Sequence, residues 1–167
     1  MAEIMRATLD DVKGIHAITQ LAFKMYRDEI ESDVPLKALT ETEEDIACDI
    51  LSNHVYVAKV GGKVLGSIRI EKLTDDLAYI YRFSVHPDEQ NAGIGTELLS
   101  HAISECARMG FAAVALHTNA KYFKLARYYY GKQFYVHSTN AERGYIRALF
   151  VKELKDKEVD LSKALEK

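Results

Sequence analysis

The chain has 167 residues, of which 48% are hydrophobic and 28% are charged, and its formal net charge is −3. That balance fits one globular domain with a buried core and excludes an intrinsically disordered chain. The small negative charge argues against nucleic acid and anionic lipid as partners. No apolar run approaches the ~20 residues of a membrane-spanning helix, and no signal peptide is evident, so we expect a cytoplasmic protein.

The cysteines and histidines give no sign of a metal site. Cys48 and Cys106 follow neither a metal-ligand spacing nor a disulfide pattern, so both are expected to be reduced and mostly buried. The six histidines are scattered without metal-ligand spacing. We therefore expect no metal.

The first third of the chain has helical periodicity. After Thr8, which can cap a helix, apolar residues recur at helical spacing and form one stripe: Val12, Ile15, Ile18, Leu21 and Ala22. A second helical region is expected over residues 26–52. It carries nine acidic residues between Asp28 and Asp49 against the single Lys37, a charge that either attracts a cationic amine or forms a solvated face.

From residue 54 the pattern changes to that of strands. Residues 54–60 and 63–70 are rich in β-branched residues and are joined by two glycines. This is a hairpin signal, because glycine accepts a positive φ at little cost. A third strand is expected over 78–85, after a turn at 74–76.

After Pro87 helices and strands alternate. The expected elements are a helix over 92–109, a buried strand over 111–117, a helix over 121–131, and strands over 134–138 and 145–152. The pattern predicts an α/β (α+β) fold with a mixed, mostly antiparallel sheet flanked by helices. Residues 1–152 would form a single domain, and the charged tail 153–167 an exposed helix.

The segment from Gln90 to Gly95 carries the strongest chemical signal. A strand runs into Pro87, a short polar loop follows, and Gly93 and Gly95 open an amphipathic helix. A helix start leaves backbone N–H groups without intrahelical partners and adds the positive end of the helix dipole, which together suit a phosphate. Glycines there keep side chains from blocking an anion. The segment therefore indicates a phosphate-bearing ligand, or else a helix that begins with glycines for close packing.

Two common phosphate-binding motifs do not fit this segment or its neighbours. A dinucleotide fingerprint needs a third glycine three residues after the second, where this chain has Leu98. A P-loop ending at Lys63 would need a leading glycine at Val57 and a hydroxyl residue at Val64. Another class of phosphate-bearing ligand is therefore indicated.

The surroundings of the segment resemble the GNAT superfamily of N-acetyltransferases. That family has a strand ending in Val-x-Pro and then Gln/Arg-x-x-Gly-x-Gly/Ala. Here residues 85–87 read Val-His-Pro, and residues 90–95 read Gln-Asn-Ala-Gly-Ile-Gly. The resemblance extends to the opening residues 6–11, to the hairpin at 61–66 and to the stretch 116–134.

The resemblance implies acetyl-CoA as cosubstrate, lying where the central strands of the sheet splay apart. Amides of the loop would hold the pyrophosphate, and the preceding strand would hold the pantetheine arm. The residues implied in binding the cofactor are Phe83, Ser84, Val85, Gln90, Asn91, Ala92, Gly93, Ile94, Gly95, Thr96, Asn119 and Tyr129. For Asn119 an ordinary turn cap is an equal alternative.

The resemblance places Tyr129 where the family has its catalytic tyrosine, beside the thioester sulfur. A phenol there can protonate the departing CoA thiolate. Successive helical residues point about 100° apart, so Tyr128, Tyr129 and Tyr130 cannot all face one groove, and the other two remain alternatives. Gln133 stands where the family most often has glycine. Because Gln133 suits a positive φ poorly, Gly131 is the alternative residue for that turn, which would shift the register.

The acceptor amine must lose a proton before it attacks, which requires a base or a water chain. Family members often use a glutamate on the central strands, but Tyr79 occupies that position here. The remaining candidates are Glu71, at the end of the preceding strand, and His86. Each is also interpretable as a solvated residue at a strand end.

We therefore expect an acetyl-CoA-dependent N-acetyltransferase that acetylates a primary amine of a small molecule or peptide by direct attack. The alternatives are a non-catalytic acyl-CoA-binding or sensor protein of the same fold, and a structural module with an empty groove. Acceptor selectivity is expected from residues 26–52 and from the loop 139–144. The oligomeric state is left open, with a homodimer as one alternative because related proteins often dimerise.

Overall fold

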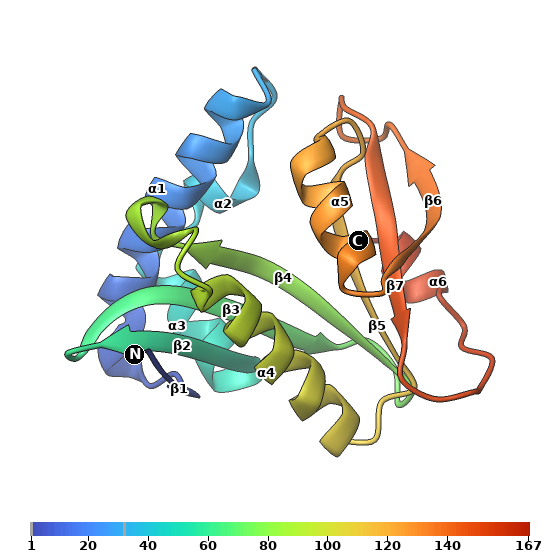
Figure 1. Ribbon diagram of the computed structural model, residues 1–167, viewed down its shortest axis with the longest axis horizontal. Coiled ribbons are helices and arrows are strands. Elements are labelled where there is room, and N and C mark those ends of the chain that lie inside the picture. Colours follow the sequence, from blue (N-terminus) through green and yellow to red (C-terminus); the bar gives the residue numbers. More distant parts are fainter. Residues whose placement is uncertain (1, 32) are drawn as a thin grey trace. The chain divides into compact units, whose positions relative to one another are not determined.

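The computed structural model of the chain describes residues 2–31 and 33–167. Within those residues it forms a seven-stranded sheet in the order β1-β2-β3-β4-β5-β7-β6 (Figure 1). The strands are β1 (Glu3–Arg6), β2 (His54–Val60), β3 (Lys63–Lys72), β4 (Leu77–Val85), β5 (Ala113–Asn119), β6 (Tyr135–Asn140) and β7 (Arg147–Glu153). The helices are α1 (Val12–Glu29), α2 (Lys37–Thr40), α3 (Glu43–Ser52), α4 (Ile94–Arg108), α5 (Phe123–Gly131) and α6 (Ser162–Leu165), with short 3₁₀ helices η1 (Leu9–Asp11) and η2 (Pro87–Glu89).

The sheet is mixed and mostly antiparallel. β1 pairs with β2, β2 with β3, and β7 with both β5 and β6, all in antiparallel register. β4 and β5 run parallel, and their ladder joins Leu77–Tyr79 to Ala113–Ala115. Helices flank the sheet, so the predicted fold class is confirmed.

The chain divides into two compact units. The first contains the residues up to Ile70 together with Arg82–Ser104, and the second contains Glu71–Tyr81 together with Glu105–Lys167. Each unit has an apolar core of its own. The elements β3, β4 and α4 contribute residues to both units.

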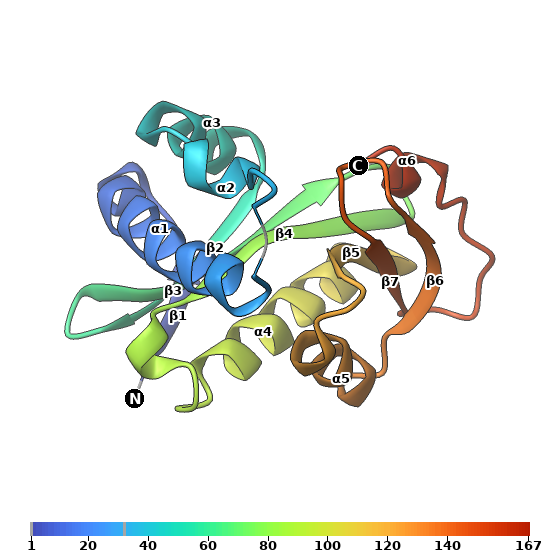
Figure 2. The same ribbon diagram turned by 90° about the horizontal axis from the view of Figure 1, so that it is seen from above.

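In the first unit, α1 and α3 lie on one side of β2 and β3, and the start of α4 lies on the other (Figure 2). The core on the α1 and α3 side consists of buried apolar side chains: Ala7, Ile15, Ile18, Ile46, Ile50, Val55, Val57 and Val64. On the other side, a Cβ built on Gly66 of β3 would lie 2.6 Å from Leu98 Cδ1 of α4. A larger residue at this position would force Leu98 to move, so glycine lets α4 pack closely on the sheet.

In the second unit, α5 and α6 cover opposite faces of β7 (Figure 1). Tyr129 of α5 contacts Phe150 on one face, with ring centroids 5.5 Å apart. The other face carries a buried cluster that includes a residue of α6: Leu77, Tyr79, Ala113, Ala115, Leu149, Val151 and Ala164. The segment before α6 is tied down by Lys157, whose ammonium donates to Asp76 at 2.8 and 2.9 Å.

Three elements differ from the sequence-based expectations. β1 is not predicted by periodicity, because four residues are too few to show alternation. The helical region expected over 26–52 consists of the end of α1, the single turn α2 and the longer α3. The exposed helix expected over 153–167 is wrong, since only Ser162–Leu165 are helical and Ala164 is fully buried. Lysines of this segment bind Asp76 and the carbonyl of Gly110 instead of forming pairs along a helix.

The two cysteines are free and differ in exposure. Cys106 is buried, and burial together with the neighbouring Glu105 raises the pKa of its thiol to about 12. Cys48 is exposed on α3, so the expectation of burial is wrong for this residue. Cys48 lies two positions from both Ile46 and Ile50, about 200° around the helix, so its thiol points away from the core that they face.

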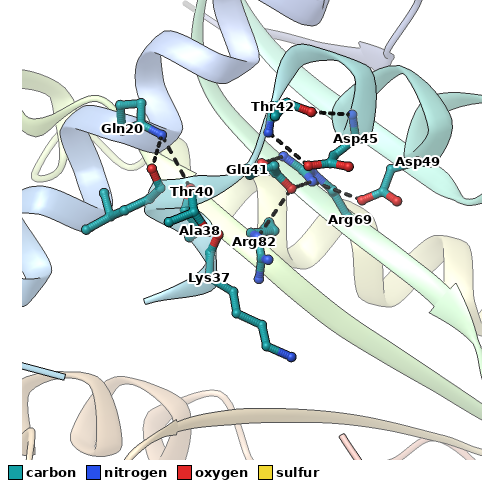
Figure 3. Close-up of polar contacts among 11 residues, drawn as sticks. Gln20, Lys37, Ala38, Thr40, Glu41, Thr42, Asp45, Asp49, Arg69 and Arg82 are labelled. Carbon is teal, nitrogen blue, oxygen red and sulfur yellow. Dashed lines mark hydrogen bonds and ion pairs between the residues drawn. The ribbon is translucent and has the colours of Figure 1, made fainter. Parts of the chain in front are cut away.

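A buried arginine organises the polar part of the first unit. Arg69 of β3 is fully buried, and its terminal nitrogens donate to Glu41 at 2.5 and 2.9 Å (Figure 3). One of them also donates to Asp49 of α3 at 2.9 Å. Burial alone would lower the pKa of Arg69, but the hydrogen bonds and charges of the two carboxylates raise it above its usual value. Two acidic residues of the 28–49 region are therefore held by an internal cation.

Glu41 also reaches Arg82 of β4, which completes the Arg69 cluster (Arg69, Glu41, Asp49 and Arg82). Arg82 Nε lies 3.4 Å from Glu41 Oε1, and Arg82 has a φ of +49° (Figure 3). A left-handed conformation at a non-glycine residue costs about 1–3 kcal/mol and needs support from its surroundings. Glu41 gives that support at the position immediately before Phe83, in the strand that leads to the candidate cofactor segment.

Replacing Glu41 with alanine should destabilise the chain strongly, because Arg69 would lose its bidentate partner while its charge stays buried. We expect a loss of about 3–5 kcal/mol in the free energy of unfolding, measured by urea denaturation. Glu44→Ala is the control, since Glu44 is exposed in the first turn of α3 and should change that free energy by less than about 1 kcal/mol. Equal stability of the two variants would contradict a structural role for the Arg69 cluster.

Candidate functional site

The candidate phosphate-binding segment lies in the first unit, where β4 ends and α4 begins. η2 follows β4, and Gly93 takes a left-handed φ of +85° immediately before the first residue of α4. Glu97 donates to the carbonyl of Gly93 at 3.0 Å. Within residues 2–31 and 33–167, the N–H groups of Gly93, Ile94 and Gly95 have no acceptor. Three consecutive backbone donors at the positive end of a helix form an anion-binding arrangement.

Glycine is needed at positions 93 and 95 for different physical reasons. At Gly93 the positive φ disfavours any residue with a Cβ, although the space around that position is open. At Gly95 a Cβ would lie 3.3 Å from Val85 Cγ2 and 3.5 Å from Phe83 Cζ. Gly95 therefore serves close packing of α4 on β4, whereas Gly93 shapes the turn that presents the free amides.

The strand that precedes the segment is brought against the start of α4. Phe83 and Val85 point toward Gly95, and Ser84 points the other way. The Ser84 hydroxyl is buried and has no hydrogen-bond partner in the described part of the chain. Gln90 reaches back to the carbonyl of Val85 over 3.5 Å, a long contact that fastens the loop only weakly.

The remaining residues predicted for the cofactor segment lie on the surface of the same turn. Asn91 and Ala92 are exposed, and the Ala92 amide donates to the carbonyl of Glu89 at 3.2 Å. Thr96 is half-buried in the first turn of α4. The structure thus brings the predicted residues from Phe83 to Thr96 together as one strand, turn and helix start.

The tyrosines of α5 lie in the second unit and differ in exposure. Tyr129 is buried, Tyr128 is half-buried, and Tyr130 is 56% exposed. The Tyr129 ring packs edge-on against Phe134, with centroids 5.6 Å apart, in addition to its contact with Phe150. Tyr130 also contacts Phe150, with ring centroids 5.8 Å apart, but of the three tyrosines Tyr129 is the buried one.

The turn after α5 resolves the question of register. Gln133 itself adopts a φ of +67°, so the alternative in which Gly131 supplies this turn is wrong. The amides of Lys132 and Phe134 both donate to the carbonyl of Tyr129 at 3.0 Å, which closes the helix end around Gln133. These hydrogen bonds offset the cost of a left-handed glutamine, and the spacing from Tyr129 to Phe134 is unshifted.

The two candidate bases already have partners. Glu71 accepts a hydrogen bond from the Lys167 ammonium at 2.5 Å. His86 lies in the other unit, where its Nδ1 accepts from the Asp88 amide at 3.3 Å at the start of η2. Glu71 as the base stays a prediction.

Asn119 is buried at the end of β5, in the second unit. Its side-chain oxygen accepts from the Lys121 amide at 2.9 Å, and its carbonyl accepts from Tyr122 at 3.2 Å. The side chain therefore caps the turn into α5, as one of the two expectations for it states. Its contact with pantetheine stays a prediction.

A tyrosine–histidine pair was missed by sequence reasoning. Tyr79 of β4 and His117 of β5 are hydrogen-bonded, with 2.7 Å between the phenol oxygen and Nδ1. Burial, and then the charges of Arg147 and Arg143, lower the pKa of His117 to about 4, so the imidazole is neutral at neutral pH. A histidine inside the otherwise uncharged run of residues 113–119 is the signal that could have revealed it.

The lowered pKa of His117 predicts how stability depends on pH. The unfolded chain takes up a proton at His117 near pH 6.5, whereas the folded chain resists it down to about pH 4. The stability that comes from a neutral His117 is therefore complete above pH 6.5 and is lost as the pH falls toward 4. NMR titration should give an imidazole pKa of about 4, and urea denaturation should show a weaker pH dependence in His117→Asn.

His137→Asn is the control for this measurement, because His137 is exposed on β6 and should leave the pH dependence of the stability unchanged. A His117 pKa near 6.5 in the folded protein would contradict the burial and charge effects described above.

Two other kinds of site are absent from residues 2–31 and 33–167. No group of three or more His, Cys, Asp and Glu side chains is placed to hold a metal ion. No helix of these residues combines the length and apolar character needed to cross a membrane.

Several solved structures share this fold. The PaiA N-acetyltransferase of Thermoplasma acidophilum, solved with coenzyme A, aligns over 92% of this chain and 99% of its own, with a TM-score of 0.80 at 17% identity. The ribosomal-protein-S18-alanine N-acetyltransferase of Escherichia coli aligns over 96% and 99%, with a TM-score of 0.75 at 18% identity. YncA of Salmonella typhimurium, solved with its cofactor acetyl-CoA, aligns over 96% and 98%, with a TM-score of 0.74 at 18% identity. At these identities the likeness establishes the fold.

The family assignment comes from sequence. No curated protein sequence matches the chain. The sequence model of the acetyltransferase (GNAT) family matches residues 16–134, which is more than half of the chain and includes both the Gln90–Gly95 segment and Tyr129. The chain therefore belongs to the acetyltransferase (GNAT) family.

Proposed function

We propose that this acetyltransferase moves the acetyl group of acetyl-CoA to a primary amine of a small molecule or peptide. The observation that carries the proposal is the row of free amides at Gly93, Ile94 and Gly95, at the start of α4. The CoA pyrophosphate is the anion that these donors would hold. Similar structures contain coenzyme A or acetyl-CoA, which supports this choice of ligand.

The residues present fit the acyl-CoA cosubstrate. Gly93 leaves open space beside the free amides, so no side chain competes with a pyrophosphate. Phe83, Ser84 and Val85 would line the pantetheine arm, and the carbonyls and amides of an extended strand suit its two amide groups. We assign the same residues to cofactor binding as the sequence does: Phe83, Ser84, Val85, Gln90, Asn91, Ala92, Gly93, Ile94, Gly95, Thr96, Asn119 and Tyr129.

In the proposed reaction, the amine nitrogen attacks the thioester carbonyl carbon, and the carbon–sulfur bond breaks. The departing thiolate takes a proton from Tyr129. The proton that the amine nitrogen loses as it becomes an amide passes to a base or to water, and a proton from solvent restores the Tyr129 phenol. The products are an N-acetylated acceptor and CoA with a free thiol. Tyr129 suits the role of acid because it is buried and held in one orientation by three aromatic neighbours, Tyr128, Phe134 and Phe150.

The acceptor amine needs a base or a chain of water molecules that removes its proton. Glu71 would have to exchange its contact with Lys167 for the substrate ammonium, which carries the same charge. His117 is neutral at neutral pH but, with a pKa of about 4, holds a proton too weakly to drive removal from an ammonium. We therefore propose that the acceptor reacts as the free amine, with Glu71 as the candidate that assists.

An acyl-CoA sensor without catalysis is the second candidate function. The observation that favours it is that Tyr79 replaces the family's usual glutamate while Glu71 is paired with a lysine. Calorimetric titration with acetyl-CoA, followed by assays of CoA release with amino acids, peptides, polyamines and aminoglycosides, separates the two. Tight binding with no turnover on any acceptor would favour the sensor.

Gly93→Glu should weaken acetyl-CoA binding, because its carboxylate would stand beside the pyrophosphate in the open space at this turn. We expect a ~100-fold higher dissociation constant than for Gly93→Gln, as repulsion of about 3 kcal/mol implies. The two variants have the same side-chain length and share the strain at φ +85°, so their difference isolates the charge. Equal affinity in calorimetry would remove the amides of α4 from pyrophosphate binding.

Tyr129→Phe should lower kcat for CoA release by about 10²- to 10⁴-fold, because the thiolate would lose its proton donor. Binding of acetyl-CoA should change little, since the ring contacts with Phe134 and Phe150 remain. Tyr130→Phe is the matched control, at an exposed position on the same helix. If Tyr129→Phe kept full activity while Tyr130→Phe lost it, the acid would be Tyr130.

A further inference from the structure

A buried arginine of the second unit has no hydrogen-bonded or ion-paired partner among the described residues. Arg147 opens β7 opposite Asn119 of β5, and only 4% of its surface is exposed. Its Nε is shielded from solvent, and across residues 2–31 and 33–167 its guanidinium makes no hydrogen bond or ion pair. Proteins rarely bury an arginine without an anion, because desolvating a lone charge is unfavourable.

The neighbours of Arg147 do not neutralise it. Arg143 repels it from the β6–β7 loop, while Glu142, Tyr145 and Tyr79 lie within attractive range. Glu142 is exposed and, in the described part of the chain, forms no ion pair with Arg147. Burial, and then the charge of Arg143, lower the pKa of Arg147 below its usual value despite the attraction of these three groups.

A second unpartnered polar atom belongs to the same face of the sheet. Leu149 pairs with His117, and Arg147 with Asn119, so alternation places His117 and Arg147 on one face of the β5–β7 ladder. While Tyr79 engages His117 Nδ1, the buried Nε2 has no partner within the described residues. In the tautomer in which the phenol donates to Nδ1, Nε2 carries a hydrogen that a ligand can accept.

We propose that Arg147, assisted by His117 Nε2, binds a carboxylate of the acceptor, which makes the acceptor a small amine that carries a carboxylate, such as a free amino acid. The inference rests on the proposed function and names its substrate class. Its amine nitrogen would form the amide bond to the acetyl carbon as the CoA thiolate leaves with a proton, which gives an N-acetyl amino acid.

A carboxylate fits this site better than other anions. The planar guanidinium matches the two oxygens of a carboxylate, and a neutral imidazole adds one donor without more charge. Glu142 lies close enough to disfavour a doubly charged phosphate, and Arg143 is partly engaged, since it donates to the backbone carbonyl of Lys167. Within the described residues, the unpaired guanidinium of Arg147 therefore suits a ligand with a single negative charge.

The test compares acids with their amides. Wild-type protein is titrated by calorimetry with a panel of N-acetyl amino acids and the corresponding N-acetyl amino acid amides, and CoA release is measured with the amino acids and amino acid amides. We expect at least one acid to bind and react about 10- to 100-fold better than its amide, as a charge-assisted hydrogen bond implies. Equal use of acids and amides, or no binding of any acid, would overturn the inference.

Variants then assign the effect to Arg147. Arg147→Met should abolish the preference for acids while leaving acetyl-CoA affinity unchanged. It should also unfold at an equal or higher urea concentration, because it removes an uncompensated buried charge. Arg108→Met, at an exposed arginine of α4, should keep the preference. Arg147→Met with an intact preference for acids would also overturn the inference.

If the methionine variant fails to fold, Arg147→Lys is tested instead. Lysine keeps the positive charge but cannot form the bidentate contact of a guanidinium with a carboxylate. It should reduce the preference for acids about 10-fold, and an unchanged preference would overturn the proposed geometry. Failure of the proposed function has a different result: wild-type protein would bind no acetyl-CoA, or would release CoA with neither acids nor amides. The comparison of N-acetyl acids with their amides requires no turnover, so it tests carboxylate binding at Arg147 separately from the proposed function.

Discussion

The first unit depends on the ion pairs that the buried Arg69 guanidinium forms with Glu41 and Asp49. The guanidinium is fully buried, and Glu41 and Asp49 satisfy it from the segment before α3 and from α3 itself. Glu41 also supports Arg82, whose left-handed φ interrupts β4 just before Phe83. Removing Arg69 or Glu41 leaves a partner's charge in the interior, so α3, β3 and β4 are energetically coupled through this pair. The acidic region is thus first of all internal structure.

Local rules predicted much of the fold. The helical stripe of α1, the glycine hairpin between β2 and β3 and the helix start at Ile94 follow from periodicity and from glycine's freedom at positive φ. The misses have nonlocal causes. Ala164 is buried because α6 covers a sheet face, and nothing in a charged tail predicts that face. Gln133 takes a glycine-like conformation because the hydrogen bonds to the Tyr129 carbonyl support it.

The residues of the candidate site also differ in whether local sequence predicts them. The segment from Gln90 to Gly95 is a local motif, so its turn and free amides could be anticipated from spacing. Tyr79, His117 and Arg147 are far apart in the sequence and become neighbours only through strand register, which pairs Tyr79 with Ala115 and His117 with Leu149. Sequence patterns leave that register open. Charged or titratable residues inside buried strands are nevertheless visible in advance and mark where to look.

The contrast between the two cysteines makes this chain convenient for spectroscopy. A maleimide dye reacts with thiolates at accessible positions, and Cys106 is neither accessible nor ionised near neutral pH. Cys48 is exposed on α3, adjacent in sequence to Asp49, which binds Arg69. The natural sequence therefore accepts a single fluorophore without mutagenesis. Its emission would report on the surroundings of α3, the helix whose Asp49 binds the buried Arg69.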